Sequence, residues 1–128
     1  MDSKNGVVET RYDNGELKSR ANFKNGILDG LFEEWYENGK QLSRETYKDG
    51  ERSGLNELWY ENGQQWLKEN HKDGELDGLR ESWYESGQLE SRTNYKNDKL
   101  DGLCELWYEN GKQLLRANYK DGIKRNIL

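Results

Sequence analysis

The chain has 128 residues, the size of one domain, and its 20 Lys and Arg residues against 25 Asp and Glu give a net charge of −5. This acidic balance argues against a nucleic-acid-binding or membrane-surface protein. Hydrophobic residues make up only 31% of the chain and charged residues 35%, which excludes a thick apolar core. Aromatic residues still reach 12% and recur at regular intervals, so a thin, repetitive fold is expected.

Targeting and redox signals are few. The single cysteine, Cys104, has no partner for an intramolecular disulfide, which favours a reduced compartment. No segment is apolar over the length needed to span a bilayer, and the N-terminal stretch has no apolar run. We therefore expect a cytoplasmic protein, unless a signal peptide or lipid anchor precedes Met1.

One sequence pattern recurs five times at an offset of 24 residues without a gap, and the tyrosine row shows it: Tyr12, Tyr36, Tyr60, Tyr84 and Tyr108. A tryptophan row precedes it at Trp35, Trp59, Trp83 and Trp107. We expect a single repeat domain over 1–128, with units 6–29, 30–53, 54–77, 78–101 and 102–125 and a partial sixth unit at 126–128.

Each unit is predicted to form a β-hairpin. In the second unit Asn38-Gly39 separates two short aromatic-containing runs, which is typical of a two-residue type I′ turn. Asp49-Gly50 predicts a second turn that leads into the next unit, and Asn97-Asp98 is expected to be the least ideal turn of that kind. The predicted fold is all-β, an elongated single-layer antiparallel meander of about ten strands.

A two-residue turn at Asn38-Gly39 fixes the strand register, because facing residues then have numbers that sum to 77. It pairs Trp35 with Leu42 and places opposite charges together in every unit: Glu9–Arg20, Glu33–Arg44, Glu57–Lys68, Glu81–Arg92 and Glu105–Arg116. The leucine row is expected to form the apolar stripe between units: Leu31, Leu55, Leu79 and Leu103. The Gly30 row is expected to mark a bulge or bend.

The segments WYENGKQL (Trp35 to Leu42) and YKDGERSGL (Tyr47 to Leu55) resemble the MORN repeat in its bacterial variant form, and the resemblance covers residues 6–126. It implies an elongated sheet of β-hairpins. Similar bacterial proteins are often antitoxins or immunity proteins, which neutralise a toxin by binding it. Other MORN proteins act as scaffolds or membrane-proximal adaptors, so the resemblance implies binding and leaves the partner open.

The polar residues give no indication of an enzyme, because they occur in equivalent rows such as Glu33, Glu57, Glu81 and Glu105. We interpret His71 as a structural substitute for the Tyr or Phe of other units, and Cys104 as a tolerated small residue. The acidic stretch 73–78 lacks a full counterpart in other units, which argues against calcium. We expect no catalytic residue, no metal, no cofactor and no nucleic-acid partner.

The positions at which the units differ are the candidates for a binding site. The hairpin register places Trp66 opposite Trp59, which predicts a patch of two indoles. Nearby variable positions carry apolar residues where other units carry polar ones. The complete candidate set is Trp66, Trp59, Leu58, Phe32, Leu67, Leu106 and Leu115.

Taken together, these patterns predict a non-catalytic protein-binding repeat protein. The expected partner is a protein, and the resemblance suggests a toxin that is neutralised by binding. The alternative is a structural scaffold or adaptor, in which sheet edges mediate self-association or the protein joins a membrane-proximal assembly.

Overall fold

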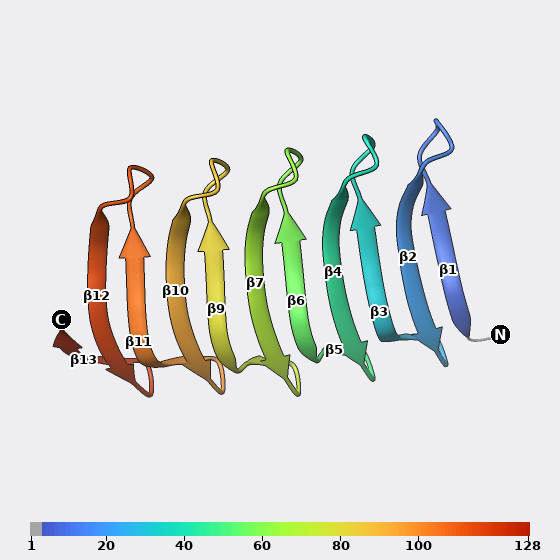
Figure 1. The fold of residues 1–128 in the computed structure, drawn as a ribbon. Coiled ribbons are helices and arrows are strands. Elements are labelled where there is room, and N and C mark those ends of the chain that lie inside the picture. Colours follow the sequence, from blue (N-terminus) through green and yellow to red (C-terminus); the bar gives the residue numbers. More distant parts are fainter. Residues whose placement is uncertain (1–3) are drawn as a thin grey trace.

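The computed structural model describes residues 4–128 as one antiparallel sheet of 13 strands, in the order β1-β2-β3-β4-β6-β7-β9-β10-β11-β12-β13 (Figure 1). The short strands β5 and β8 lie off this path and pair with β4 and β7. The strands are β1 (Gly6–Arg11), β2 (Leu17–Lys24), β3 (Ile27–Trp35), β4 (Gln41–Lys48), β5 (Glu51–Arg52), β6 (Gly54–Trp59), β7 (Gln65–Lys72), β8 (Glu75–Leu76), β9 (Gly78–Trp83), β10 (Leu89–Lys96), β11 (Lys99–Trp107), β12 (Gln113–Lys120) and β13 (Ile123–Ile127). The predicted all-β, single-layer meander is confirmed.

The charge pairs have the predicted register in all five hairpins: Glu9↔Arg20, Glu33↔Arg44, Glu57↔Lys68, Glu81↔Arg92 and Glu105↔Arg116. In the first hairpin Arg20 Nε lies 2.9 Å from Glu9 Oε2. Glu33 and Glu57 also accept hydrogen bonds at 3.0 Å, from the side chains of Gln41 and Gln65. Charge complementarity therefore supports the register along the whole sheet.

The hairpin turn differs from the predicted type I′ turn. The N–H of Gly39 donates to the Tyr36 oxygen at 2.9 Å, and the N–H of Tyr36 donates to the Lys40 oxygen at 2.8 Å. Gly39 has φ +87°, whereas Asn38 is not among the residues with positive φ. The turn is therefore type I with a glycine bulge, and the Asn38 side-chain oxygen supports it by accepting the N–H of Lys40 at 2.9 Å.

This turn changes the pairing at the top of each hairpin. Trp35 faces Gln41 and not Leu42, while Glu34 faces Ser43 as the original register requires. Leu42 is thus the extra residue of a β-bulge. The predicted pair Trp35–Leu42 is wrong because the turn holds one residue more than the predicted two-residue turn.

The turns between units are the two-residue type I′ turns of this chain. Asp49 and Gly50 have φ +51° and +84°, so both central residues are left-handed. Asp98 takes the second position of the fourth such turn with φ +65°, where the other turns have glycine. The prediction that this turn is the least ideal therefore has a structural basis, because a side chain makes this conformation costly.

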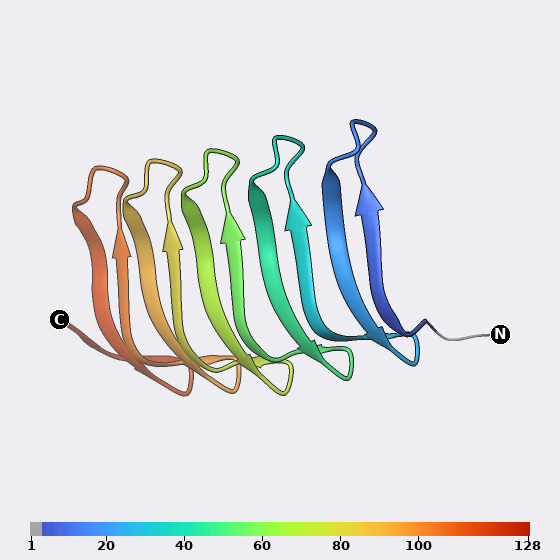
Figure 2. The same cartoon turned by 45° about the vertical axis from the view of Figure 1, so that its right-hand side comes forward.

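The Gly30 row marks a bulge, as predicted. Phe23 faces Leu28 while Ala21 faces Phe32, so three residues of β3 lie opposite the single residue Asn22. Gly30 has φ +107°, and an added Cβ there would lie 3.3 Å from the Cβ of Asn22. The strands bend near these bulges, and the lower part of the sheet turns sharply from the upper part (Figure 2).

A hydrogen-bond ladder joins successive hairpins at the turn end. The phenol of each tyrosine donates to the main-chain oxygen of the tryptophan in the next hairpin, at 2.6 to 2.7 Å: Tyr12 to Trp35, Tyr36 to Trp59, Tyr60 to Trp83 and Tyr84 to Trp107. These bonds act between nearest neighbours, which is how an array without a central core is held together.

The two faces of the sheet differ in burial. The buried residues of the described chain, three apolar and seven polar, all lie on one face: Ala21, Ser43, Glu45, Asn56, Glu69, Ser82, Ser91, Thr93, Cys104 and Ala117. No second layer covers either face in the described chain, so the curvature of the sheet buries these residues. We call the face that carries them the concave face.

The leucine row lies on the opposite, outer face. Leu55 and Leu79 are 38% and 39% exposed there, so the predicted apolar stripe between units is wrong for them.

Candidate binding face

Apart from the tyrosine row, which borders the concave face, the repeated and the varied rows described below lie on different faces of the sheet. The outer face carries the rows that recur almost unchanged, such as the tryptophans and the Glu–Arg/Lys pairs. The concave face carries the rows that change from hairpin to hairpin. One concave row reads across the sheet as Thr10, Ser19, Glu34, Ser43, Leu58, Leu67, Ser82, Ser91, Leu106 and Leu115.

Four of the predicted site residues form two apolar pairs in this row. Leu58 faces Leu67, and Leu106 faces Leu115. A polar pair separates them, because Ser82 and Ser91 face each other with their hydroxyl oxygens 2.5 Å apart. The row therefore alternates between apolar and polar pairs, and the serines leave a depression between the larger leucines.

The predicted Trp59–Trp66 patch is wrong. Trp59 faces Gln65 on the outer face, because Trp66 is the extra residue of the bulge in this hairpin. Trp66 lies on the concave face, where its indole stacks on the ring of Tyr60 with the ring centroids 5.4 Å apart and the planes at 25°. Trp66 remains 41% exposed, so the stacking orients the indole without covering it.

Trp66 borders a hollow of the concave face, a depression of about 410 Å³. Its apolar walls come from three successive hairpins and its floor from Ser82 and Ser91. We call it the Trp66 hollow and define it by its lining residues: Trp66, Leu67, Arg80, Ser82, Tyr84, Glu90, Ser91, Leu106, Trp107 and Leu114. It brings together Trp66, Leu67 and Leu106 of the predicted set.

The remaining predicted residues lie elsewhere on the sheet. Phe32 packs edge-on against Tyr47, with the ring centroids 6.3 Å apart. Leu115 lines a smaller hollow near the C-terminal edge together with Ile127. Trp59 lies on the outer face, so the seven predicted residues do not form one continuous patch.

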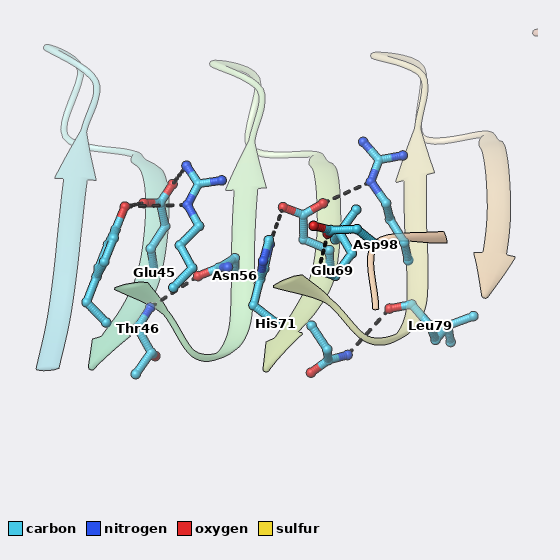
Figure 3. Close-up of polar contacts among 12 residues, drawn as sticks. Glu45, Thr46, Asn56, Glu69, His71, Leu79 and Asp98 are labelled. Atoms are coloured by element: carbon cyan, nitrogen blue, oxygen red, sulfur yellow. Dashed lines mark hydrogen bonds and ion pairs between the residues drawn. The ribbon is translucent and has the colours of Figure 1, made fainter. Parts of the chain in front are cut away.

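A polar cluster near the middle of the concave face was not predicted (Figure 3). Glu45 accepts a hydrogen bond from the phenol of Tyr47 at 2.7 Å, and the guanidinium of Arg52 lies 3.6 Å from its other oxygen. One hairpin further along, Glu69 lies 3.0 Å from His71 Nε2 and 2.9 Å from Arg80 Nε. Two buried carboxylates are thus each held by an aromatic-row residue and an arginine.

The structure places His71 as predicted, in the position of an aromatic side chain. Its side chain is 8% exposed, and its Nδ1 atom is buried without a hydrogen-bond partner, as is Nδ2 of Asn56 nearby. Burial alone would raise the pKa of Glu69, but the hydrogen bonds from His71 and Arg80 and the positive charge of Arg80 outweigh it, so the pKa is lowered. The cluster therefore holds an ionised carboxylate inside the concave face.

The sequence signal for this cluster was the change from small residues to glutamate in one row: Ala21, Glu45, Glu69, Thr93 and Ala117.

Within residues 4–128, no three His, Cys, Asp or Glu side chains are grouped so that they could hold a metal ion. The same residues include no helix that is long and apolar enough to cross a membrane.

An open, single-layer array of hairpins with one varied face defines a class of tandem-repeat proteins whose exposed face is available for binding. The family model of the MORN repeat variant matches residues 4–25, 28–49, 76–97 and 100–121, and the chain belongs to this family. MORN repeats generally bind proteins or membranes and are not catalytic modules. Comparison with curated protein sequences gave no match.

The matched segments leave out residues 50–75, which include most of the third hairpin. This hairpin carries Trp66, Leu58, Leu67 and His71 on the concave face. The segment that the family model leaves unmatched is therefore also the segment that carries Trp66.

Proposed function

We propose that the protein is a non-catalytic binding protein that holds another protein against its concave face. The observation that carries this proposal is the separation of the rows, because the residues that differ between hairpins gather on the concave face. The tryptophan row and the charge pairs, which repeat in the hairpins, lie on the outer face, and the tyrosine row is the repeated row that borders the concave face. The varied side chains of the concave face are not needed for stacking, so they can differ between hairpins and match the surface of a partner.

A protein partner fits the chemistry of this face better than a membrane or a nucleic acid. The apolar pairs Leu58–Leu67 and Leu106–Leu115 and the exposed Trp66 are set among polar side chains, which is the usual composition of a protein interface. The net charge of −5 opposes binding to anionic lipid or phosphate.

We further propose that this partner is a toxin, which the protein neutralises by covering a functional surface of it. The resemblance to bacterial MORN-variant antitoxins and immunity proteins supports this choice. An extended face made from several hairpins offers enough area to cover an active site or a target-binding surface.

Co-expression with the product of each gene next to its own tests the proposal. Growth inhibition by one of these products should be relieved by the intact protein and restored by the double variant Trp66→Ala/Leu58→Asp. The matched control is Leu55→Asp, which introduces the same charge in the same strand but on the outer face, and it should still protect. Toxicity that the intact protein leaves unchanged would overturn the toxin role. Protection that the concave double variant retains would overturn the proposed face.

A second candidate function, a self-associating scaffold, is favoured by the two edge strands of the described sheet. β1 and β13 carry exposed apolar side chains, with Val7 58% and Ile127 71% exposed. Such edges can pair with another strand. Sedimentation over a wide concentration range distinguishes the two, because a scaffold should show larger species at high concentration and a strictly monomeric protein would contradict it.

A further inference from the structure

The Trp66 hollow is shaped to receive a side chain. The small, buried residues Ser82 and Ser91 lie between Leu67 and Leu106 in the same row, so the floor is lower than its two sides. The bulges add Trp66 on one side and Leu114 on the other, and both remain exposed, at 41% and 51%. Burying these two side chains together with an apolar group of a partner is favourable, at about 25 cal/mol per Å² of apolar surface.

The indole of Trp66 is held in place before any partner binds. Its stacking on Tyr60 fixes the ring orientation, and Tyr60 is itself fixed by its hydrogen bond to the Trp83 oxygen at 2.6 Å. A side chain that is already ordered loses little conformational entropy on binding. Trp66 therefore has the properties of an interface anchor.

The rim of the hollow is acidic. Burial raises the pKa of Tyr84, and the carboxylates of Glu90 and Glu109 raise it further. Burial likewise raises the pKa of Tyr60 first, followed by Glu90, Glu85 and Glu109. Glu90 itself lines the hollow, while Glu85 directly follows the lining residue Tyr84 and Glu109 comes two residues after the lining residue Trp107. The rim therefore carries negative charge on the side of the turns.

The one cation among the described lining residues, Arg80, does not offset this charge, because its Nε lies 2.9 Å from Glu69. Glu90 lines the hollow and accepts a hydrogen bond from the neutral hydroxyl of Ser82 through Oε1 at 2.9 Å. A cation beside the hollow would meet uncompensated carboxylates.

A single-layer sheet has no second layer to close over a ligand, so a small molecule would stay half in water. A segment of a partner protein differs, because the rest of the partner shields the bound side chain from water. The partner can also contact the rest of the concave face beyond the hollow. We infer that the Trp66 hollow receives one bulky apolar side chain from a positively charged segment of the partner protein. This inference rests on the proposed function and specifies the chemistry of the partner.

The test is an NMR titration of ¹⁵N-labelled protein with synthetic peptides, because chemical shifts detect weak binding and locate it. The probe is a nine-residue peptide with a central Phe between pairs of Lys, in Gly and Ser termini. Two matched peptides replace the Phe with Ala or all Lys with Glu. The first peptide should shift the Trp66 indole signal and the Leu67 and Leu106 amides. Both replacements should weaken binding at least about tenfold.

Matched protein variants locate the effect. Trp66→Ala should weaken binding of the Lys-Phe peptide about tenfold or more, whereas Leu42→Ala, at the same bulge position of the second hairpin, should not. Glu90→Lys with Glu109→Lys should also weaken it, whereas Glu37→Lys, the turn position equivalent to Glu109, should leave it unchanged. Circular dichroism melting confirms that each variant is folded.

Equal shifts from the Lys and Glu peptides, shifts confined to the outer face, or binding that Trp66→Ala leaves intact would overturn the inference. The co-expression experiment separates this result from the proposed function. Toxin neutralisation without selective peptide binding refutes the hollow's specificity alone, whereas selective peptide binding without neutralisation of any neighbouring product refutes the toxin role alone.

Discussion

The phenol of Tyr60 donates a hydrogen bond to the main-chain oxygen of Trp83 in the next hairpin, across an oxygen–oxygen distance of 2.6 Å. Because the same bond recurs between each described hairpin and the next, it links the tops of all five. The sheet has no central core, so its stability depends on such nearest-neighbour interactions. The tyrosine row is therefore a structural row, although its rings also border the concave face.

Replacing Tyr60 by Phe should lower the free energy of unfolding by about 1 kcal/mol, because the ring is kept and only the hydroxyl that satisfies the Trp83 oxygen is lost. Tyr108→Phe is the matched control. Tyr108 is 51% exposed and lies in the last hairpin, so its change should be close to neutral. Urea unfolding of both variants measures the difference, and equal losses would contradict a role for the ladder.

The strand register could be predicted from the sequence because the charge pairs recur in every hairpin and constrain it independently of the turn. The position of Trp66 could not. An Asn-Gly pair fits a type I′ turn and also a type I turn with a glycine bulge, and the two differ by one residue. In the structure the Asn62 side-chain oxygen accepts the N–H of Gln64 at 2.9 Å, which favours the second form. That single residue moves Trp66 away from Trp59.

The Glu69 cluster could not be predicted from the sequence either, because one of its members comes from another hairpin. His71 and Glu69 are two residues apart and lie on the same face of one strand, but Arg80 comes from the neighbouring hairpin. Its approach depends on the pairing between β7 and β9, which follows a two-residue turn and a bulge. Register across units was the least constrained part of the prediction, because it depends on the bulge at the Gly30 row, and the sequence does not show how many residues that bulge holds.

Glycine is needed to different degrees in the turns between units, and Gly50 and Gly122 show the difference. Both have a left-handed backbone, with φ +84° and +81°. An added Cβ at Gly50 would lie 2.8 Å from Cγ2 of Ile27, whereas at Gly122 the nearest atom is 3.9 Å away. Gly50→Ala should therefore be less stable than Gly122→Ala by about 1 kcal/mol, since the backbone cost of about 1 kcal/mol is common to both.

Thermal unfolding followed by circular dichroism compares these two variants directly. Because both carry the same substitution in the same turn type, effects on the unfolded chain cancel. Equal melting temperatures would show that Ile27 moves aside without cost.

Cys104 should react slowly with a thiol reagent while the protein is folded. The residue is 4% exposed, and burial raises the pKa of its thiol, with Glu105 adding to the effect and Lys124 opposing it. Less thiolate and less access both reduce the rate. Reaction with Ellman's reagent at pH 8 should be at least about tenfold faster in guanidinium chloride than in buffer. The single cysteine makes the readout unambiguous, and equal rates would contradict its burial.

Acid should destabilise the protein in part through Glu69. Its pKa in the folded state is lowered, because the hydrogen bonds from His71 and Arg80 and the positive charge of Arg80 outweigh the effect of burial. A carboxyl with a lowered folded-state pKa stabilises the fold fully above its unfolded pKa, which is about 4.3 for glutamate. That contribution is lost as the pH falls through the folded-state pKa.

Urea unfolding at several pH values between about 7 and 3 measures this contribution. Glu69→Gln keeps the size of the side chain but cannot ionise, so the variant should be less stable than the wild type near pH 7 and approach it as the pH falls below about 4. Arg80→Gln removes one of the two partners and should reduce the same pH dependence by part of its amplitude. If the wild type and Glu69→Gln lose stability in parallel over the whole range, the carboxylate is not held in its ionised form by this cluster, and the buried charge on the concave face must be compensated elsewhere.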